Sequence, residues 1–269
     1  MTILDRHYVH VVGRGDRTLF LSHGFGCNQS MFRYMVEELR EDYRMVLYDL
    51  AGSGNYPSEL FNAERYQSLV GYAQDAIAIA EALEFNDMVF VGHSVSSMIG
   101  VLAANRRPDL FSSLVLIGPS ARYINDGDYY GGFSEQDIDE LLQTMGSNYQ
   151  GWSAAMAPAI MGNTECPELG GELTDNFCRT NPVLAQQFAE VTFRGDNRAD
   201  LPQVSVPTLV LQCREDIIAS EEVGRYVHEH IAGSEFVILD ARGHCPNLSA
   251  PGQTSAAVRN FLSGIEVGV

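Results

Sequence analysis

Three side chains of the types that nucleophilic catalysis needs occur in the order Ser94, Asp216, His244. Ser94 lies in the motif Gly-His-Ser-Val-Ser, Asp216 follows an apolar run, and His244 lies in Gly-His-Cys-Pro. A serine hydroxyl is a weak nucleophile near neutral pH, so it needs a histidine base that a carboxylate orients. The pattern predicts a Ser94–His244–Asp216 triad that attacks acyl carbonyl groups.

The residues around Ser94 have the pattern of a sharp turn between a strand and a helix. The apolar run 88–91 precedes the motif, and a helical run of small and apolar residues, 98–104, follows it. This context is required of a nucleophile elbow, which holds the serine out of the sheet. Ser96 replaces the last glycine of the usual G-x-S-x-G motif, but it is still a small residue.

Other residues compete for the same roles. Glu215 is next to Asp216, and Asp240 lies four residues before His244, where we expect it to shape the loop. Cys245 could be a nucleophile, but no elbow precedes it, so we interpret it as part of a pocket wall. We do not expect the remaining histidines to act as the base. His93 should point away from Ser94, and His23 should support a loop. His228 and His230 lie on a predicted surface helix, and His7 and His10 lie near the N-terminus.

A glycine-rich loop near the N-terminus is expected to help stabilise the oxyanion. Residues 23–26, His-Gly-Phe-Gly, follow a predicted buried strand. Acyl transfer requires two backbone N–H groups that stabilise an oxyanion. We expect these from Val95, directly after the nucleophile, and from Phe25, whose side chain would also line the pocket.

The elements that must position these residues alternate between strands and helices, which is typical of an α/β fold with a mostly parallel, doubly wound sheet. Ligands of such sheets bind beyond the carboxyl ends of the strands. The expected strands are 8–12, 18–22, 44–48, 88–91, 114–117, 206–212 and 235–239, and the expected helices include 31–39, 66–84, 220–231 and 253–262.

The alternation stops between about 120 and 200, where the pattern is helical. Ser134 with Asp137 forms a capping signature, and Asn181-Pro182 supplies another helix start. We expect helices at about 134–146, 148–161, 167–180 and 182–194. Residues 1–120 and 200–269 would form the core, and 121–199 an inserted lid. Most of the large apolar residues of this lid should pack between its helices, and a minority should line a pocket. These residues are Tyr123, Phe133, Leu141, Trp152, Met156, Phe177, Phe188 and Phe193.

Composition excludes several classes of function. The 269 residues carry a formal net charge of −18, which argues against nucleic-acid or anionic-membrane binding. The N-terminus does not resemble a signal peptide, and no apolar run approaches the length of a membrane span. Five scattered cysteines predict free thiols in a reducing cytoplasm. No metal-ligand spacing or dinucleotide fingerprint occurs, so we expect no cofactor.

Six motifs together resemble those of one known family: residues 23–30, 48–54, 92–96, 130–133, 212–219 and 243–249. The resemblance is to the RsbQ-like family of α/β hydrolases, whose relatives include the plant karrikin and strigolactone receptors. It covers nearly the whole chain.

The resemblance implies an α/β-hydrolase fold with a four-helix V-shaped cap over a small, largely hydrophobic pocket. It implies the triad Ser94, Asp216 and His244. Met156, Ala159 and Thr192 differ from the plant receptors, so ligand preference does not transfer. The pocket residues implied are Phe25, Tyr123, Trp152, Phe193 and Ile218.

We therefore expect a serine hydrolase that cleaves small hydrophobic esters or lactones through an acyl-enzyme. The alternative is a signalling protein in which slow hydrolysis serves perception of a small molecule. The resemblance implies for that case a partner such as a phosphatase with a PAS domain. A carbon–carbon bond hydrolase uses the same triad and is a third possibility.

Overall fold

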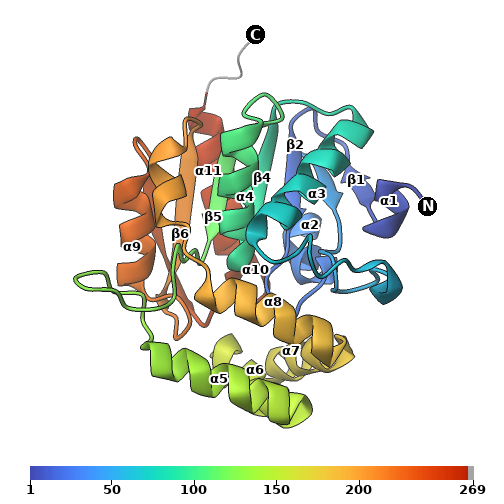
Figure 1. The fold of residues 1–269 in the computed structure, drawn as a ribbon. Coiled ribbons are helices and arrows are strands. Elements are labelled where there is room, and N and C mark those ends of the chain that lie inside the picture. Colours follow the sequence, from blue (N-terminus) through green and yellow to red (C-terminus); the bar gives the residue numbers. More distant parts are fainter. Residues whose placement is uncertain (266–269) are drawn as a thin grey trace.

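The computed structural model describes residues 1–265 and contains a seven-stranded sheet with the order β1-β3-β2-β4-β5-β6-β7 (Figure 1). β1 is antiparallel to β3, and the other neighbouring strands are parallel, which confirms the predicted α/β fold. Residues 266–269 of the expected core lie outside the described residues. The strands are β1 (His10–Gly13), β2 (Thr18–Ser22), β3 (Arg44–Leu47), β4 (Met88–His93), β5 (Phe111–Ile117), β6 (Thr208–Glu215) and β7 (Glu235–Arg242).

Helices cover both faces of the sheet because strand residues alternate between the two faces. In β2, Leu19 and Leu21 join the cluster beneath α2 and α11, whereas Phe20 joins the cluster beneath α3 and α4. All three side chains are fully buried. The helices of the core are α1 (Ile3–Arg6), α2 (Arg33–Leu39), α3 (Leu69–Leu83), α4 (Val95–Arg106), α9 (Glu221–His230), α10 (Pro246–Ser249) and α11 (Pro251–Gly264).

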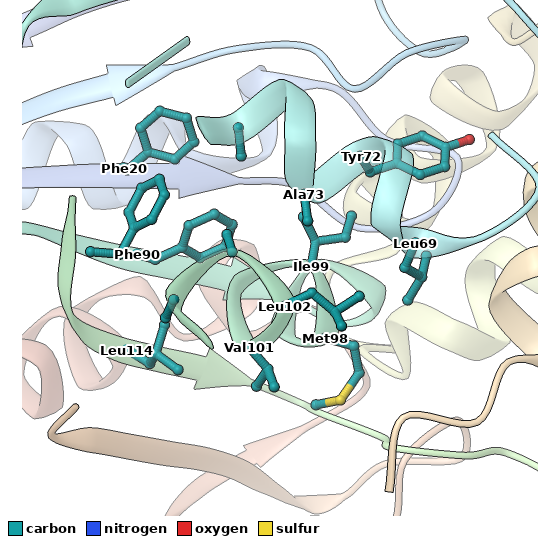
Figure 2. Close-up of a cluster of buried hydrophobic side chains, with 14 of the residues drawn as sticks. Phe20, Leu69, Tyr72, Ala73, Phe90, Met98, Ile99, Val101, Leu102 and Leu114 are labelled. Carbon is teal, nitrogen blue, oxygen red and sulfur yellow. The ribbon is translucent and has the colours of Figure 1, made fainter. Parts of the chain in front are cut away.

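The larger cluster holds α4, the helix that follows Ser94, against the sheet (Figure 2). Phe20 and Phe90 stack with their ring centroids 5.5 Å apart, and Ile99 and Met98 of α4 reach into the same cluster. A Cβ atom at Gly100 would lie 2.5 Å from the Phe90 ring, so the helix needs glycine to approach this closely. The first turn of α4 is thereby fixed relative to the sheet edge.

Four helices inserted between β5 and β6 cover one edge of the sheet (Figure 1). α6 packs against α7, and α5 packs against α8. Ser134 and Asp137 form the predicted capping box, and the Asn181 side chain accepts the Val183 N–H. The observed bounds lie within one residue of those predicted: α5 (Glu135–Ser147), α6 (Tyr149–Met161), α7 (Pro167–Arg179) and α8 (Pro182–Arg194).

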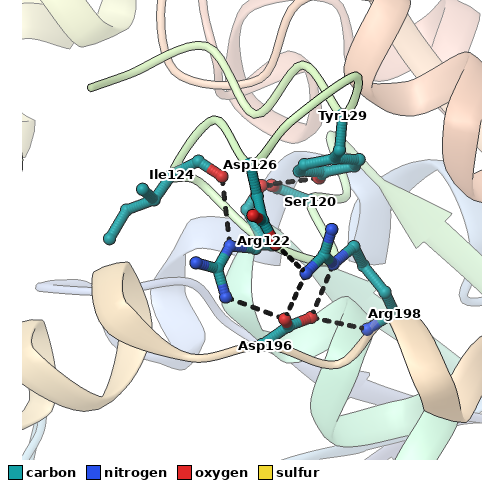
Figure 3. A network of polar contacts seen from close by, with 7 residues as sticks. All are labelled: Ser120, Arg122, Ile124, Asp126, Tyr129, Asp196 and Arg198. Atoms are coloured by element: carbon teal, nitrogen blue, oxygen red, sulfur yellow. Dashed lines mark hydrogen bonds and ion pairs between the residues drawn. The ribbon is translucent and has the colours of Figure 1, made fainter. Parts of the chain in front are cut away.

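A polar network joins the two chain segments that connect these helices to the core (Figure 3). Asp196 on the returning segment pairs with Arg122 at 2.8 Å and with Arg198 at 2.7 Å. Arg198 also pairs with Asp126 at 2.7 Å and lies over the Tyr129 ring, 4.7 Å from its centroid. The network ties the outgoing and returning segments together at their base.

The structure differs from the expected elements mainly at their ends. α1, which Thr2 and Asp5 cap, and the one-turn α10 were not predicted, because four-residue helices give no periodic signal. The expected strands at 8–12 and 206–212 start two residues later, at His10 and Thr208. The expected helix 66–84 starts at Leu69, after Ser68 in an extended conformation.

No helix within residues 1–265 combines the length and the apolar character needed to cross a membrane. Over the same residues, no group of three or more His, Cys, Asp or Glu side chains is arranged to hold a metal ion.

Candidate active site

Ser94 occupies the turn between β4 and α4 in a strained backbone conformation, with φ 58° and ψ −125°. A residue other than glycine adopts positive φ at a cost of about 1–3 kcal/mol, and such strain is common at functional sites. The turn is so tight that a Cβ atom at Gly92 would lie 2.3 Å from the carbonyl oxygen of Ser96. The sequence Gly-His-Ser-Val-Ser therefore forms the sharp turn that it predicts.

The structure brings the three predicted chemical groups into one hydrogen-bonded line. The Ser94 hydroxyl lies 2.7 Å from His244 Nε2, and His244 Nδ1 lies 2.7 Å from Asp216 Oδ2. All three side chains are nearly or fully buried. In this arrangement Nδ1–H donates to the carboxylate, which leaves Nε2 free to accept the serine proton.

The Asp216 carboxyl is held ionised in spite of its burial. Burial alone would raise the pKa of Asp216, but the neighbouring His244 ring and backbone donors lower it below its usual value. The N–H groups of Ile218 and Ala219 donate to Asp216 Oδ1 at 2.8 and 3.1 Å. The carboxylate is thus fixed by one turn of backbone as well as by its histidine partner.

The loop that carries His244 is fixed from two sides by backbone contacts. The His244 N–H donates to the Ile160 carbonyl of α6 at 2.8 Å, and the Gly243 N–H donates to the Glu215 carbonyl at 2.7 Å. Gly243 has φ +81°, a conformation that favours glycine. The placement of His244 therefore depends on a contact with the inserted helices.

His93 has a supporting role that the sequence did not reveal. As expected, its side chain makes no hydrogen bond to Ser94 among the described residues. Instead Nε2–H donates to the His244 carbonyl oxygen at 2.7 Å. Burial and the nearby His244 ring lower the pKa of His93 to about 3, so the ring stays neutral. No sequence signal identifies this contact, because it joins residues 151 positions apart.

The competing carboxylates lie away from His244. Glu215 and Asp240 are exposed, and they pair with Arg242 at 3.2 Å and with Arg214 at 3.3 Å. Ion pairs at such exposed positions contribute little to stability. Asp216 is the carboxylate that the fold turns inward.

The two backbone N–H groups expected to stabilise an oxyanion have no acceptor of their own. Among residues 1–265, neither the N–H of Phe25 nor that of Val95 has a hydrogen-bond partner. Val95 begins α4, whose N-terminus carries partial positive charge. The loop with Phe25 packs directly on the elbow, because a Cβ atom at Gly24 would lie 3.2 Å from Ser94 Cβ. Both expected donors therefore belong to segments that contact the elbow and have no competing acceptor.

An apolar cavity lies between the sheet edge and the inserted helices, with Ser94 and His244 at its base. The cavity volume is about 40 Å³. All five expected pocket residues, Phe25, Tyr123, Trp152, Phe193 and Ile218, line it. Further lining residues are Cys27, Leu141, Met156, Ile160, Leu173, Phe177, Thr192 and Cys245.

The expectation that only a minority of the large apolar cap residues line the pocket is wrong. Six of the eight do, and the exceptions are Phe133 and Phe188. Phe188 stacks on Tyr72 of α3, with ring centroids 4.7 Å apart. Side chains such as Trp152, Phe177 and Phe193 belong to the hydrophobic cluster of the cap and also line the cavity, so one set of residues forms both the cap core and the cavity wall.

The cavity wall also contains groups that remain protonated. Burial raises the pKa of Cys27 to about 12 and that of Cys245 well above its usual value. A thiol needs its thiolate form to act as a nucleophile, so neither cysteine competes with Ser94. Burial likewise raises the pKa of Tyr123.

Comparison with known proteins identifies the family. Residues 19–257 match the family model described as the alpha/beta hydrolase family. The chain belongs to the alpha/beta hydrolase family.

Relatives within this family are similar along almost their whole length. The chain is 40% identical to karrikin insensitive 2 receptor CA from Petunia hybrida, over 92% of each chain. It is 39% identical to strigolactone esterase D14 from Arabidopsis thaliana, over 97% of each chain. The structure of a hydrolase from Oleispira antarctica superposes with a TM-score of 0.95 at 38% identity, covering 98% of this chain and 97% of that one. The expected relation to the karrikin and strigolactone receptors is confirmed.

Proposed function

We propose that this alpha/beta hydrolase cleaves small hydrophobic esters or lactones with Ser94 as its nucleophile. The observation that carries the proposal is the line from Ser94 Oγ through His244 to Asp216, with 2.7 Å at each step, at the base of an apolar cavity. A relative named as an esterase, 39% identical, supports the same reaction class.

In the first half of the reaction, His244 Nε2 takes the Ser94 proton as Oγ attacks the substrate carbonyl carbon. The resulting oxyanion accepts hydrogen bonds from the Phe25 and Val95 N–H groups. His244 then passes the proton to the leaving alkoxide, which departs as an alcohol, and the acyl group remains on Ser94. With a lactone, the alcohol stays tethered to the acyl group.

In the second half, His244 removes a proton from a water molecule, which attacks the acyl-enzyme through a second tetrahedral intermediate. Release of the carboxylic acid restores the Ser94 hydroxyl. Asp216 keeps the proton on His244 Nδ1 and stabilises the positive charge that the ring acquires in both halves. No cofactor is needed for these steps.

The cavity supports a small apolar substrate and a lid that moves. Its walls are aromatic and aliphatic, which favours hydrophobic acyl and alcohol groups. At about 40 Å³ the cavity is small beside ligand pockets of roughly 300–1,000 Å³, so we expect the side chains or helices above Ser94 to shift when an ester enters. We assign this movement to residues 121–199 as the lid, whose outgoing and returning segments are held together by the pairs of Asp196 with Arg122 and Arg198.

Perception of a small molecule is a second candidate, because a relative 40% identical is named as a receptor. The same triad would then turn over slowly and retain the acyl group. The corresponding partner would be a signalling protein such as a phosphatase with a PAS domain. The five cysteines, none of which forms a disulfide, support a reducing compartment such as the cytoplasm.

Hydrolysis of p-nitrophenyl acetate and of a synthetic lactone tests the proposal. We expect multiple turnover in the wild type and loss of at least about a thousandfold in Ser94→Ala, with the fold intact by circular dichroism. Unchanged hydrolysis in Ser94→Ala would refute the assignment of the nucleophile. A single burst followed by a stable acyl-enzyme, detected by mass spectrometry, would favour perception instead.

A further inference from the structure

Ser96, the residue that departs from the usual G-x-S-x-G motif, joins the two halves of the candidate oxyanion site. Its hydroxyl donates to the His23 carbonyl oxygen at 2.5 Å. Ser96 lies in the first turn of α4, and His23 begins the loop that carries Phe25. Both residues are fully buried. A glycine at position 96 could not make this contact.

The direction of the hydrogen bonds follows from chemistry. A carbonyl oxygen can only accept, so Ser96 uses its one proton on His23. Ser22 therefore donates to Ser96, at 2.8 Å, and Tyr48 donates to Ser22, at 2.7 Å. The side chains of Tyr48, Ser22 and Ser96 are fully buried, and this chain runs from the residue after β3 through β2 to the elbow. Each hydroxyl donates to the next, so the chain has a single orientation.

The next peptide unit of the loop is fixed as well. The Gly24 carbonyl accepts His23 Nδ1–H at 2.9 Å and the Cys27 N–H at 3.3 Å. His23 Nε2 in turn accepts the Leu50 N–H at 3.0 Å. Since a peptide is planar, fixing the Gly24 carbonyl also fixes the direction of the Phe25 N–H.

We propose that Ser96 is a positioning residue, whose hydroxyl sets the distance between the Phe25 and Val95 N–H groups for the transition state. The inference rests on the proposed hydrolase function. Catalysis by such donors depends on their being in place before charge develops. Loss of the Ser96 bond frees the His23 carbonyl, allowing the Phe25 donor to move away from the elbow.

The experiment compares Ser96→Ala with Ser97→Ala. Ser97 is also fully buried in the first turn of α4, but its hydroxyl donates to Gly92, at 3.0 Å, and does not contact the loop. Removing one oxyanion donor outright costs about 10²–10³ in kcat. A displaced donor should cost less, so we expect kcat for p-nitrophenyl acetate to fall about 10- to 100-fold in Ser96→Ala with little change in KM. Ser97→Ala should stay within about threefold of wild type.

A second readout separates positioning from general damage. An alkyl trifluoromethyl ketone adds to the Ser94 hydroxyl and forms an oxyanion, whereas the unfluorinated ketone binds without forming one. Ser96→Ala should weaken inhibition by the fluorinated ketone in proportion to the loss in kcat/KM, with inhibition by the other ketone changed less than about twofold. Tyr48→Phe, which removes the far end of the chain, should give a smaller effect of the same kind.

Three outcomes would overturn the inference: activity of Ser96→Ala within threefold of wild type, equal loss in Ser97→Ala, or equal weakening of both ketones. Failure of the proposed function has a different signature. In that case the wild type would not hydrolyse the ester, and it would bind the fluorinated ketone no better than Ser94→Ala does. The inference about Ser96 would then be wrong as well.

Discussion

The edge of the sheet around Ser94 and the cap above it are held by different forces. At the sheet edge, buried hydroxyl and imidazole groups donate hydrogen bonds to backbone carbonyl oxygens, as Ser96 does to His23 and His93 does to His244. In the cap, aromatic rings meet: Trp152 stacks on Phe177 with centroids 5.5 Å apart.

The difference corresponds to the two tasks of the site. Hydrogen bonds have narrow distance and angle preferences, so they fix reacting groups to within tenths of an ångström. Apolar contacts are non-directional and allow side chains to repack around different ligands. Changes at the sheet edge should therefore alter rate, and changes in the cap should alter selectivity.

The largest effect should come from Asp216→Asn, which breaks the sheet-edge arrangement at its buried end. The amide would no longer hold the proton on His244 Nδ1, and we expect kcat/KM for p-nitrophenyl acetate to fall about 10³- to 10⁴-fold. Asp240→Asn is the matched control, since that carboxylate is exposed and pairs with Arg214. A loss of less than tenfold in Asp216→Asn would contradict the assignment.

The neutral histidines of the sheet edge should make stability depend on pH. Because the pKa of His93 is lowered to about 3, the unfolded chain binds a proton below pH 6.5 that the folded chain does not. Stability is lost as pH falls from 6.5 toward 3, by about 2 kcal/mol for His93 alone between pH 7 and 5. Burial lowers the pKa of His7 and His23 in the same direction.

Urea unfolding at pH 5, 6 and 7 measures this dependence. His93→Asn should flatten the curve relative to wild type, whereas the same substitution at His230, which is exposed on α9, should not. A wild-type stability that does not change between pH 7 and 5 would show that these rings are not buried in the neutral form.

In the cap, Trp152→Leu should alter selectivity. The smaller side chain widens the cavity, so kcat/KM for p-nitrophenyl hexanoate relative to the acetate should rise about tenfold. Phe188→Leu is the control, because Phe188 packs on Tyr72 outside the cavity lining. If both variants shifted the ratio equally, the cavity would not be the acyl site.

The smallest effect should come from the network at the base of the cap. Arg198→Gln removes the pairs with Asp126 and Asp196, and we expect a loss of up to about 1 kcal/mol in unfolding free energy because these groups are partly exposed. Arg194→Gln, on the surface of α8, should cost less. High salt should reduce the difference between the two variants, and equal losses would remove any special role for Arg198.

Much of this fold could be predicted because its signals are local. The elbow at Ser94, the capping box at Ser134 and the order of strands and helices each depend on residues close in sequence. The features that were not predicted were either very short elements or side chains with two roles. α10 is a single turn, and Trp152 and Phe177 pack together while also lining the cavity. The spacing of apolar residues cannot tell whether a side chain belongs to the helix-packing core or to the cavity lining when the same residues form both.

The sequence by itself predicted Ser94, Asp216 and His244 as the chemical groups and the order in which they reach the sheet edge, because turn geometry and chain order depend on neighbouring residues. Only the tertiary structure decided that Glu215 and Asp240 are exposed while Asp216 lies 2.7 Å from His244. It also decided how small the cavity is, and that Ser96 holds the loop of His23. The Asp216–His244 and Ser96–His23 contacts join residues 28 and 73 positions apart, and their geometry depends on how whole elements pack.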